Sequence, residues 1–313
     1  MLFFLIIKFT LVPSFRINFF SMHLKIIPSI FMLFFSANIF AQKATEIYLF
    51  DLKESDSSYT IANPVNISNN EGYDNQPSFT EDGTSILFTS TRDGQTDIAR
   101  YDITEGYRTW ITDTEVNEYS PAPYMGKKKY FTCVRFEDDN QFLYKYSYSN
   151  KEPVVLIPNL NVGYYVWFNK NVVITYVLWD IETIQVSNFK HKIKYPIAQN
   201  IGRSLNKIPN PFSIGQDRIS YISKSYGNPE IYEINPLTSE SKYIIDPIEG
   251  SEDLTWTIEG AVLMAKEDVI YKFHPKRDNG WKAIIIESKV PLNNITRLTV
   301  SPDGKKIAVV VDE

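Results

Sequence analysis

Residues 76–103 read QPSFTEDGTSILFTSTRDGQTDIARYDI, and this stretch indicates the fold class. It contains two Asp-Gly turns, Asp82-Gly83 and Asp93-Gly94, each between runs of alternating apolar residues. An Asp-Gly pair in this setting is a strong hairpin signal, because the turn requires φ > 0 and glycine adopts it at no steric cost. Two hairpins in series form a meander, so the stretch predicts consecutive antiparallel strands.

The same pattern recurs along the chain with a period of about 44 residues. Pro77 and Pro121 are 44 residues apart, and 133 residues, about three periods, separate Ile86 from Ile219. Copies of the pattern begin near residues 76, 118, 165, 218, 254 and 297. A repeat of this length is typical of four-stranded propeller blades.

The two ends of the chain hold complementary parts of one repeat. The sixth copy stops after two strands, whereas residues 46–52 match the third strand of a copy and have no hairpin partner before them. Pairing the two ends would remove the exposed edges that a linear stack leaves. We therefore predict an all-β, six-bladed β-propeller of four-stranded antiparallel blades, closed by pairing of an N-terminal strand with the C-terminal blade. A β-sandwich, the alternative all-β fold, does not predict a split last repeat.

Two segments, residues 77–90 and 298–310, resemble the WD40-like PD40 repeats. Such repeats occur in the propeller of the TolB family and in the propellers of prolyl oligopeptidases and tricorn protease. The resemblance covers roughly residues 44–313. It implies a six-bladed propeller and no single activity, because function is carried by sites grafted onto a fold.

The N-terminal region predicts export. The first 41 residues contain three basic residues and no Asp or Glu, and an apolar run at 26–40 precedes Ala41. This is the pattern of a secretory signal cleaved after Ala41, with translation starting at Met1 or Met22. We therefore expect a signal peptide at 1–41, a propeller at 42–313, a periplasmic or secreted protein, and membrane contact through the signal alone. An uncleaved membrane anchor is the alternative.

The composition and motifs give no support for nucleic-acid binding or catalysis. The formal net charge of −5 lacks the basic character of proteins that bind a phosphate backbone. His191 and His274 lie in no catalytic motif, and the sequence has no G-x-S-x-G, C-x-x-C or H-E-x-x-H pattern. We therefore predict no catalytic residue, no metal ligand and no cofactor. The Asp-rich turns at 93–97 and 137–140 are interpreted as hydrogen-bonded turns rather than Ca²⁺ sites.

The segments that lead into the first strand of each repeat form the candidate site. They should meet at one mouth of the central channel, and carboxylates and tyrosines recur in them. The fourth segment is expected at 206–210. The predicted binding residues are Asp74, Asn75, Glu118, Tyr119, Tyr164, Tyr165, Glu252 and Asp253. Clustered carboxylates attract cationic groups, and tyrosines suit contacts with peptides or sugars. A solvated acidic rim without a specific site is the alternative.

These observations favour a monomeric, exported, non-catalytic propeller that binds a protein or peptide through the channel face. The second hypothesis is a hydrolase of carbohydrate or peptide. That activity would require two channel carboxyl groups about 5 Å or 6.5–9.5 Å apart. Sequence spacing gives no distance between residues on different blades.

Overall fold

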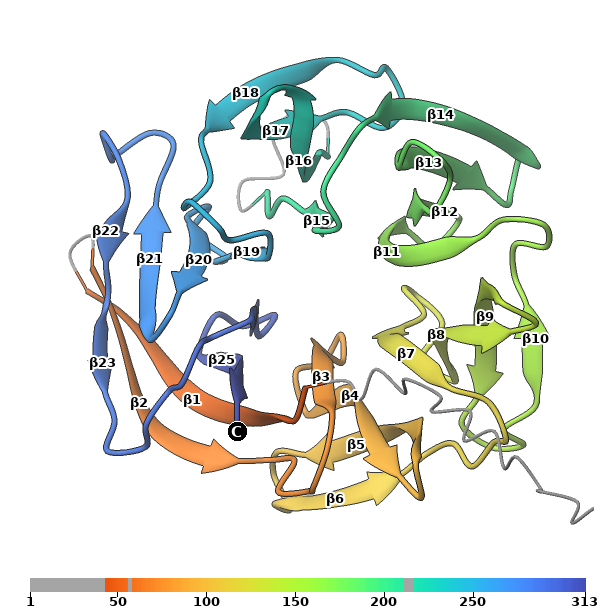
Figure 1. The fold of residues 1–313 in the computed structure, drawn as a ribbon, viewed down its shortest axis with the longest axis horizontal. Coiled ribbons are helices and arrows are strands. Elements are labelled where there is room, and N and C mark those ends of the chain that lie inside the picture. The colour runs from red at the N-terminus through yellow and green to blue at the C-terminus, as the bar shows by residue number, and fades with distance from the viewer. Residues whose placement is uncertain (1–42, 56–57, 211–216) are drawn as a thin grey trace, which may run out of the picture. The chain divides into compact units, whose positions relative to one another are not determined.

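The computed structural model describes residues 43–55, 58–210 and 217–313. Six β-sheets are arranged in a ring, and one edge strand of each sheet faces the centre of the ring (Figure 1). The prediction of a six-bladed, four-stranded antiparallel propeller is confirmed. In the described ranges, no helix is long and apolar enough to cross a membrane. The predicted signal peptide at 1–41 lies outside the described residues and stays a prediction.

Five blades follow one another along the chain. Blade 1 contains β3 (Asp74–Phe79), β4 (Ser85–Arg92), β5 (Gln95–Asp102) and β6 (Tyr107–Trp110). Blade 2 contains β7 (Glu118–Pro123), β8 (Tyr130–Glu137), β9 (Asn140–Ser147) and β10 (Pro153–Val155). Blade 3 contains β11 (Val162–Asn169), β12 (Val172–Val177), β13 (Thr183–Asn188) and β14 (Ile193–Gln199). Blade 4 contains β15 (Asn206–Lys207), β16 (Ile219–Tyr226), β17 (Asn228–Ile234) and β18 (Ser241–Ile245). Blade 5 contains β19 (Leu254–Trp256), β20 (Val262–Lys266), β21 (Val269–Phe273) and β22 (Lys282–Ala283).

Blade 6 closes the ring with both ends of the chain. It contains β24 (Arg297–Val300), β25 (Lys306–Asp312), β1 (Thr45–Ser55) and β2 (Ser58–Asn66). β1 pairs antiparallel with β25 from Thr45 opposite Asp312 to Asp51 opposite Lys306. The predicted closure is therefore confirmed.

A fifth strand in blade 6 was not foreseen from the sequence. β23 (Ile285–Glu287) pairs in parallel with residues 60–62 of β2. It comes from the segment that follows blade 5, so this segment covers the outer edge of the closing blade. A covered edge offers no template for pairing with another chain.

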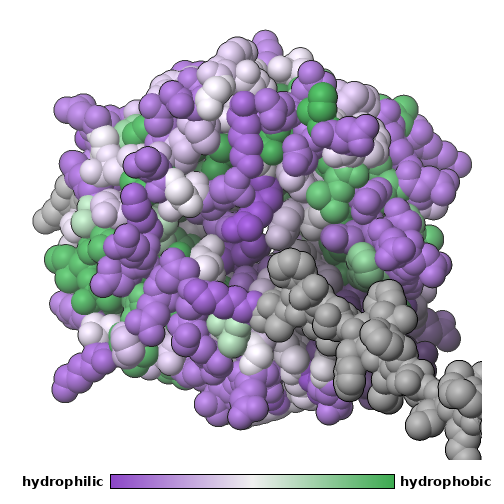
Figure 2. Space-filling model, viewed as in Figure 1, coloured by the Kyte–Doolittle hydropathy of each residue, from purple (hydrophilic) through white to green (hydrophobic). Residues whose placement is uncertain are grey.

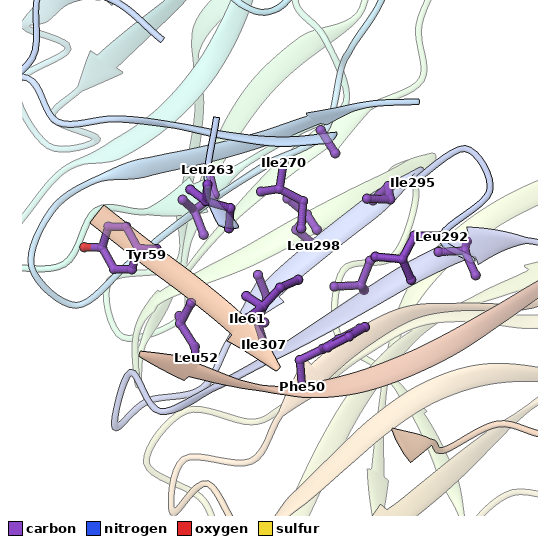
Figure 3. Close-up of a cluster of buried hydrophobic side chains, with 14 of the residues drawn as sticks. Phe50, Leu52, Tyr59, Ile61, Leu263, Ile270, Leu292, Ile295, Leu298 and Ile307 are labelled. Carbon is purple, nitrogen blue, oxygen red and sulfur yellow. The ribbon is translucent and has the colours of Figure 1, made fainter. Parts of the chain in front are cut away.

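Apolar residues on alternate strand positions form the core between neighbouring blades. The largest cluster joins blades 5 and 6 and includes Phe50, Ile61, Ile270 and Ile307, all fully buried (Figure 3). Removing a large side chain from such a position typically costs about 2–5 kcal/mol. The only cysteine, Cys133, is a fully buried core residue of β8.

The Asp-Gly turns adopt the backbone that the sequence predicts. Gly83 has φ of 70° and Gly304 has φ of 72°. A Cβ at Gly304 would also lie 2.7 Å from atoms of Ile258. Both the backbone conformation and the close packing of blade 5 against blade 6 therefore require glycine at this turn.

Candidate binding site at the channel mouth

The first residues of the inner strands and the residues just before them meet at one end of the channel and bring together six side chains, one from each blade. We call them the mouth cluster; its members are Tyr73, Tyr119, Tyr164, Arg203, Asp253 and Arg297. Each lines at least one of four adjoining cavities, and Tyr164 lines three of them. Figure 2 shows hydrophilic residues around the hollow at the centre of the ring.

The four cavities differ in their lining. Two of them, of about 180 and 280 Å³, contain Tyr164, Arg203 and Arg297. A third, of about 270 Å³, extends toward blade 5 and adds Glu249, Glu252 and Glu267. The fourth, of about 370 Å³, is lined by Tyr73, Tyr119, Tyr164, Phe136 and Leu178, among other residues. The mouth therefore has a cationic side, an acidic side and an aromatic side.

Asp74, one of the predicted residues, lies inside the wall of the propeller rather than on a cavity surface. Its side chain is fully buried, and neither carboxylate oxygen accepts a hydrogen bond from a described residue. Burial raises the pKa of Asp74 to about 7; the Glu46 carboxylate adds to the rise, and Ser90 partly offsets it. The neutral form is favoured because burial removes the carboxylate from water and the nearby Ser90 only partly compensates.

Glu118 has a similar environment in blade 2. It is fully buried and accepts a hydrogen bond from the Tyr146 hydroxyl, while its Oε2 has no partner among the described residues. Arg135 donates from Nη1 to the Tyr146 oxygen at 2.8 Å. Burial raises the pKa of Glu118, although Thr112, Tyr146 and Arg135 oppose this effect. Glu118 therefore belongs to a buried network in the wall.

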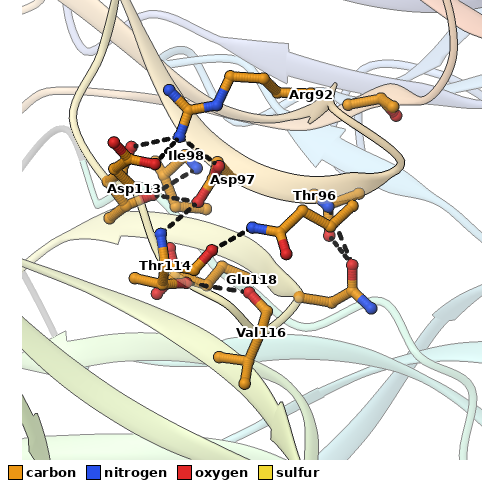
Figure 4. A network of polar contacts seen from close by, with 12 residues as sticks. Arg92, Thr96, Asp97, Ile98, Asp113, Thr114, Val116 and Glu118 are labelled. Atoms are coloured by element: carbon orange, nitrogen blue, oxygen red, sulfur yellow. Dashed lines mark hydrogen bonds and ion pairs between the residues drawn. The ribbon is translucent and has the colours of Figure 1, made fainter.

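A neighbouring network fixes the segment that leads into blade 2 (Figure 4). Arg92 Nη2 lies 2.7 Å from Asp97 Oδ2 and 2.6 Å from Asp113 Oδ1. Asp97 Oδ1 accepts a hydrogen bond from the backbone N–H of Thr114 at 3.3 Å. Because these contacts anchor residues 113 and 114 to blade 1, the following residues enter blade 2 in a fixed direction and Tyr119 faces a cavity.

The remaining neutral predicted residues lie at or near the mouth. Asn75 lines the 280 Å³ cavity, and its Oδ1 accepts a hydrogen bond from the N–H of Gln76 at 2.7 Å. Tyr165 lines the 180 Å³ cavity and donates its hydroxyl to Thr132 Oγ1 at 2.9 Å. The ring of Tyr164 lies under the guanidinium of Arg297, with 5.3 Å between Cζ and the ring centroid.

Glu252 and Asp253 lie at the mouth, but neither is an unpaired charge. Glu252 forms an ion pair with Lys224. Asp253 accepts a hydrogen bond from Arg203 Nε on Oδ2 at 3.1 Å, and its Oδ1 lies 3.5 Å from Arg297 Nη2. Burial lowers the pKa of Arg203, but Asp253 more than offsets this effect, so the pKa lies above its usual value. The mouth thus contains cations that the repeat pattern does not predict there.

Arg203 and Arg297 were missed for a definite reason. Residues 206–207 were expected to lead into blade 4, but they form its inner strand β15, so the segment that leads into the blade lies upstream and contains Arg203. In the sequence, the pattern around Arg297 indicates only the start of a strand. A usable signal was present, because Asp253 and Arg297 each precede a turn glycine, Gly260 or Gly304, by seven residues.

In the described ranges, His191, His274 and the acidic residues form no cluster suited to a metal. Among the described residues, no group of three or more His, Cys, Asp and Glu could hold a metal ion. His274 is buried, and its Nδ1 accepts a hydrogen bond from the N–H of Lys276 at 3.1 Å. His191 is in an exposed turn between β13 and β14.

Solved structures share the fold at low sequence identity. A putative TolB from Agrobacterium tumefaciens aligns with a TM-score of 0.64 and 12% identity, covering 87% of this chain and 99% of that one. TolB from Acinetobacter baumannii aligns with a TM-score of 0.56 and 12% identity, covering 86% of this chain and 65% of that one. The fold is a TolB-like six-bladed propeller.

Enzymes share this fold as well. An oligogalacturonate lyase from Vibrio parahaemolyticus aligns with a TM-score of 0.50 and 12% identity, covering 87% of this chain and 98% of that one. No protein-family model and no curated protein matches the sequence. At these identities the likeness concerns the fold alone, so the binding role of the predicted site residues stays a prediction.

Proposed function

We propose that this protein is an exported, non-catalytic propeller that binds a protein or peptide partner through the mouth cluster. The observation that carries the proposal is the convergence of three tyrosines and two arginines on adjoining cavities at one end of the channel. Tyrosine and arginine are enriched at protein interfaces, because each combines a large contact area with polar groups that give direction.

The residues at the mouth favour binding over hydrolysis. Of the four predicted carboxylates, Asp74 and Glu118 are enclosed in the wall, and Glu252 and Asp253 are paired with cations. A hydrolytic pair needs one carboxyl group that gives a proton to the substrate and a second that acts on the reacting carbon. The neighbouring enzyme folds share at most 15% identity and carry no residue-level argument for catalysis.

Export is part of the same proposal. Residues 1–41 have the sequence pattern of a secretory signal, and the TolB-like fold supports a place in the cell envelope. We expect the protein recovered from the periplasm or medium to begin at Gln42. N-terminal sequencing tests this, and a mature protein that retains residue 22 or earlier would contradict it.

The partner can be sought with the full chain carrying an affinity tag after Glu313. Capture from an envelope extract, at low and high salt, is compared for the wild type, Tyr164→Ala and the control Tyr243→Ala. Tyr243 is 45% exposed on the outer strand β18, so it tests for non-specific contact through a surface tyrosine.

We expect one protein to be captured by the wild type and by the control, and at least tenfold less by Tyr164→Ala. Thermal unfolding of each variant shows whether the propeller is intact. Capture that depends on Tyr243 but not on Tyr164 would overturn the proposed site.

A further inference from the structure

The cationic side of the mouth has a distinct composition. The cavity of about 280 Å³ is lined by three cations, Lys43, Arg203 and Arg297, and by one carboxylate, Asp312. The rest of its lining is neutral. These neutral residues are Thr45, Tyr73, Asn75, Tyr164, Asn294 and Thr296, which supply hydroxyl and amide groups. A cavity lined in this way favours an anion.

The charges within the structure leave this cavity with a positive excess. Asp312 forms an ion pair with Lys43 and accepts a hydrogen bond from Asn294. Asp253 is shared by two guanidinium groups, because Arg203 donates to its Oδ2 while Arg297 lies 3.5 Å from its Oδ1. Glu252 also lies 3.9 Å from Arg203, but it pairs with Lys224 as well. Asp253 and Glu252 therefore face three cations, Arg203, Arg297 and Lys224, and one positive charge remains.

Arg297 has unused hydrogen-bonding capacity in this cavity. No hydrogen bond joins its guanidinium to a described residue, and its side chain is 19% exposed. The ring of Tyr164 supports one face of the guanidinium at 5.3 Å, which restricts its orientation. A guanidinium has five N–H donors in a planar fork that matches the two oxygens of a carboxylate.

We propose that this cavity binds a peptide carboxylate, with Arg297 as the group that recognises it. The inference rests on the proposed function and names the chemistry of its ligand. Arg203 and Lys43 add positive charge, and Tyr73 and Thr296 line the same space. A volume of about 280 Å³ is small for a drug-sized ligand, so it holds one carboxylate-bearing residue or a chain end.

The adjoining aromatic cavity favours a peptide over a sugar acid. Tyr73 and Tyr164 also line the cavity of about 370 Å³, where Phe136 and Leu178 provide apolar surface. An extended chain can place its acidic group beside Arg297 and an apolar side chain beside Phe136. A hexuronate has hydroxyl groups on every side and gains little from this second cavity.

Four probes test the ligand chemistry on the full-length protein by isothermal titration or NMR titration. They are acetyl-Phe-Ala with a free C-terminus, acetyl-Phe-Asp-amide, acetyl-Phe-Asn-amide and D-galacturonate. We expect at least one of the two acidic peptides to bind at least tenfold more tightly than the neutral Asn peptide. The tighter of these two acidic peptides identifies the source of the carboxylate, chain end or side chain. The peptide assignment would be overturned if galacturonate bound more tightly than both acidic peptides.

Variants of Arg297 test the residue. Arg297→Gln should lower the affinity for the acidic peptide at least tenfold. Arg297→Lys should retain part of the affinity, because lysine keeps the charge but lacks the planar guanidinium that pairs with both carboxylate oxygens. The control Arg277→Gln removes a guanidinium that is 47% exposed and lies 3.7 Å from Glu54, outside the mouth cavities; it should leave the affinity unchanged. If Arg297→Gln does not fold, Arg203→Gln is used instead and should lower the affinity for the same peptide.

The outcomes separate this inference from the proposed function. Equal affinity of the acidic and neutral peptides, or of the wild type and a folded Arg297→Gln variant, would overturn the carboxylate site. Partner capture that still depends on Tyr164 would then leave the proposed function standing.

Discussion

The segments that lead into blades 2 and 5 carry carboxylates at similar places in the repeat, but the structure gives them opposite surroundings. Glu118 lies opposite Arg135 in the backbone pairing of β7 with β8, and its side chain is fully buried. In blade 5 the ladder begins only at Leu254, so Glu252 stays outside it and its side chain is 39% exposed. The comparison shows that the start of strand pairing decides whether a carboxylate lies in the wall or at the mouth.

A bulge accompanies the wall position. The register of β3 and β4 shifts between Asn75 and Ser78, and Gln76 has φ of 57°. Blade 2 repeats this feature, with Ser120 at φ of 50°. The N–H of Ser120 donates to Gln76 Oε1 at 2.8 Å, so the two bulges also join the neighbouring blades. An inserted residue of this kind redirects the side chains around it.

The largest expected effect concerns the pH dependence of the wall carboxyl Asp74. Burial raises its pKa from 3.8 to about 7, so the folded state holds its proton where the unfolded chain has released it. The free energy of unfolding should therefore fall between about pH 4 and pH 7, by on the order of 4 kcal/mol. Asp74→Asn should remove most of this fall and be more stable than the wild type at pH 8.

Urea unfolding between pH 4 and pH 8 measures this effect. Asp82→Asn is the matched control, because hydrogen bonds from Thr80 and Thr84 lower the pKa of Asp82 to about 2. Its contribution changes below about pH 4, so this variant should keep the wild-type slope above it. Parallel curves for the wild type and Asp74→Asn would contradict a buried titrating group.

The next effect compares two arginines, one in the wall and one at the mouth. Arg135 is 11% exposed and contacts the Tyr146–Glu118 pair, whereas Arg203 is 40% exposed. Arg135→Met should cost about 2–3 kcal/mol, because it leaves buried polar groups without a partner. Arg203→Met should cost less than about 1 kcal/mol. Urea unfolding measures both losses of stability. Equal losses for the two variants would contradict the distinction between wall and mouth.

A smaller effect concerns the carboxylate shared by Arg203 and Arg297. Asp253→Asn should release both guanidinium groups and raise the affinity for an acidic peptide by about threefold to tenfold, at a cost of about 1 kcal/mol in stability. Titration with acetyl-Phe-Asp-amide measures the gain. A loss of affinity would show instead that Asp253 holds the arginines in their binding positions.

The smallest effect concerns Glu252. Its ion pairs with Lys224 and Arg203 join groups that are each about 40% exposed. Glu252→Gln should therefore change the free energy of unfolding by less than about 0.5 kcal/mol. Thermal unfolding at low and high salt checks this, and a loss above about 2 kcal/mol would place Glu252 with the wall carboxyls.

The predictable part of the site follows from local chemistry. Tyr119 and Tyr164 were expected at the mouth, and the structure places both on the same cavity. The burial of the Asp74 side chain was not predictable in this way. Asp74 is fully buried beside a bulge of β3, and the bulge does not appear as a periodic pattern in the sequence.

The sequence by itself determined the repeat, the hairpin turns and the split closing blade. The turns and strands rest on residues close in the chain, through glycine at positive φ and alternating apolar positions. The split blade follows from where the repeat of about 44 residues starts and stops along the chain. The tertiary structure decided which side chains meet at the mouth, and it added β23 to blade 6. Arg203, Asp253 and Arg297 come from three blades, and only closure of the ring sets the distances between them. Spacing along a chain fixes the order of the blades, but contacts between blades depend on how their faces pack.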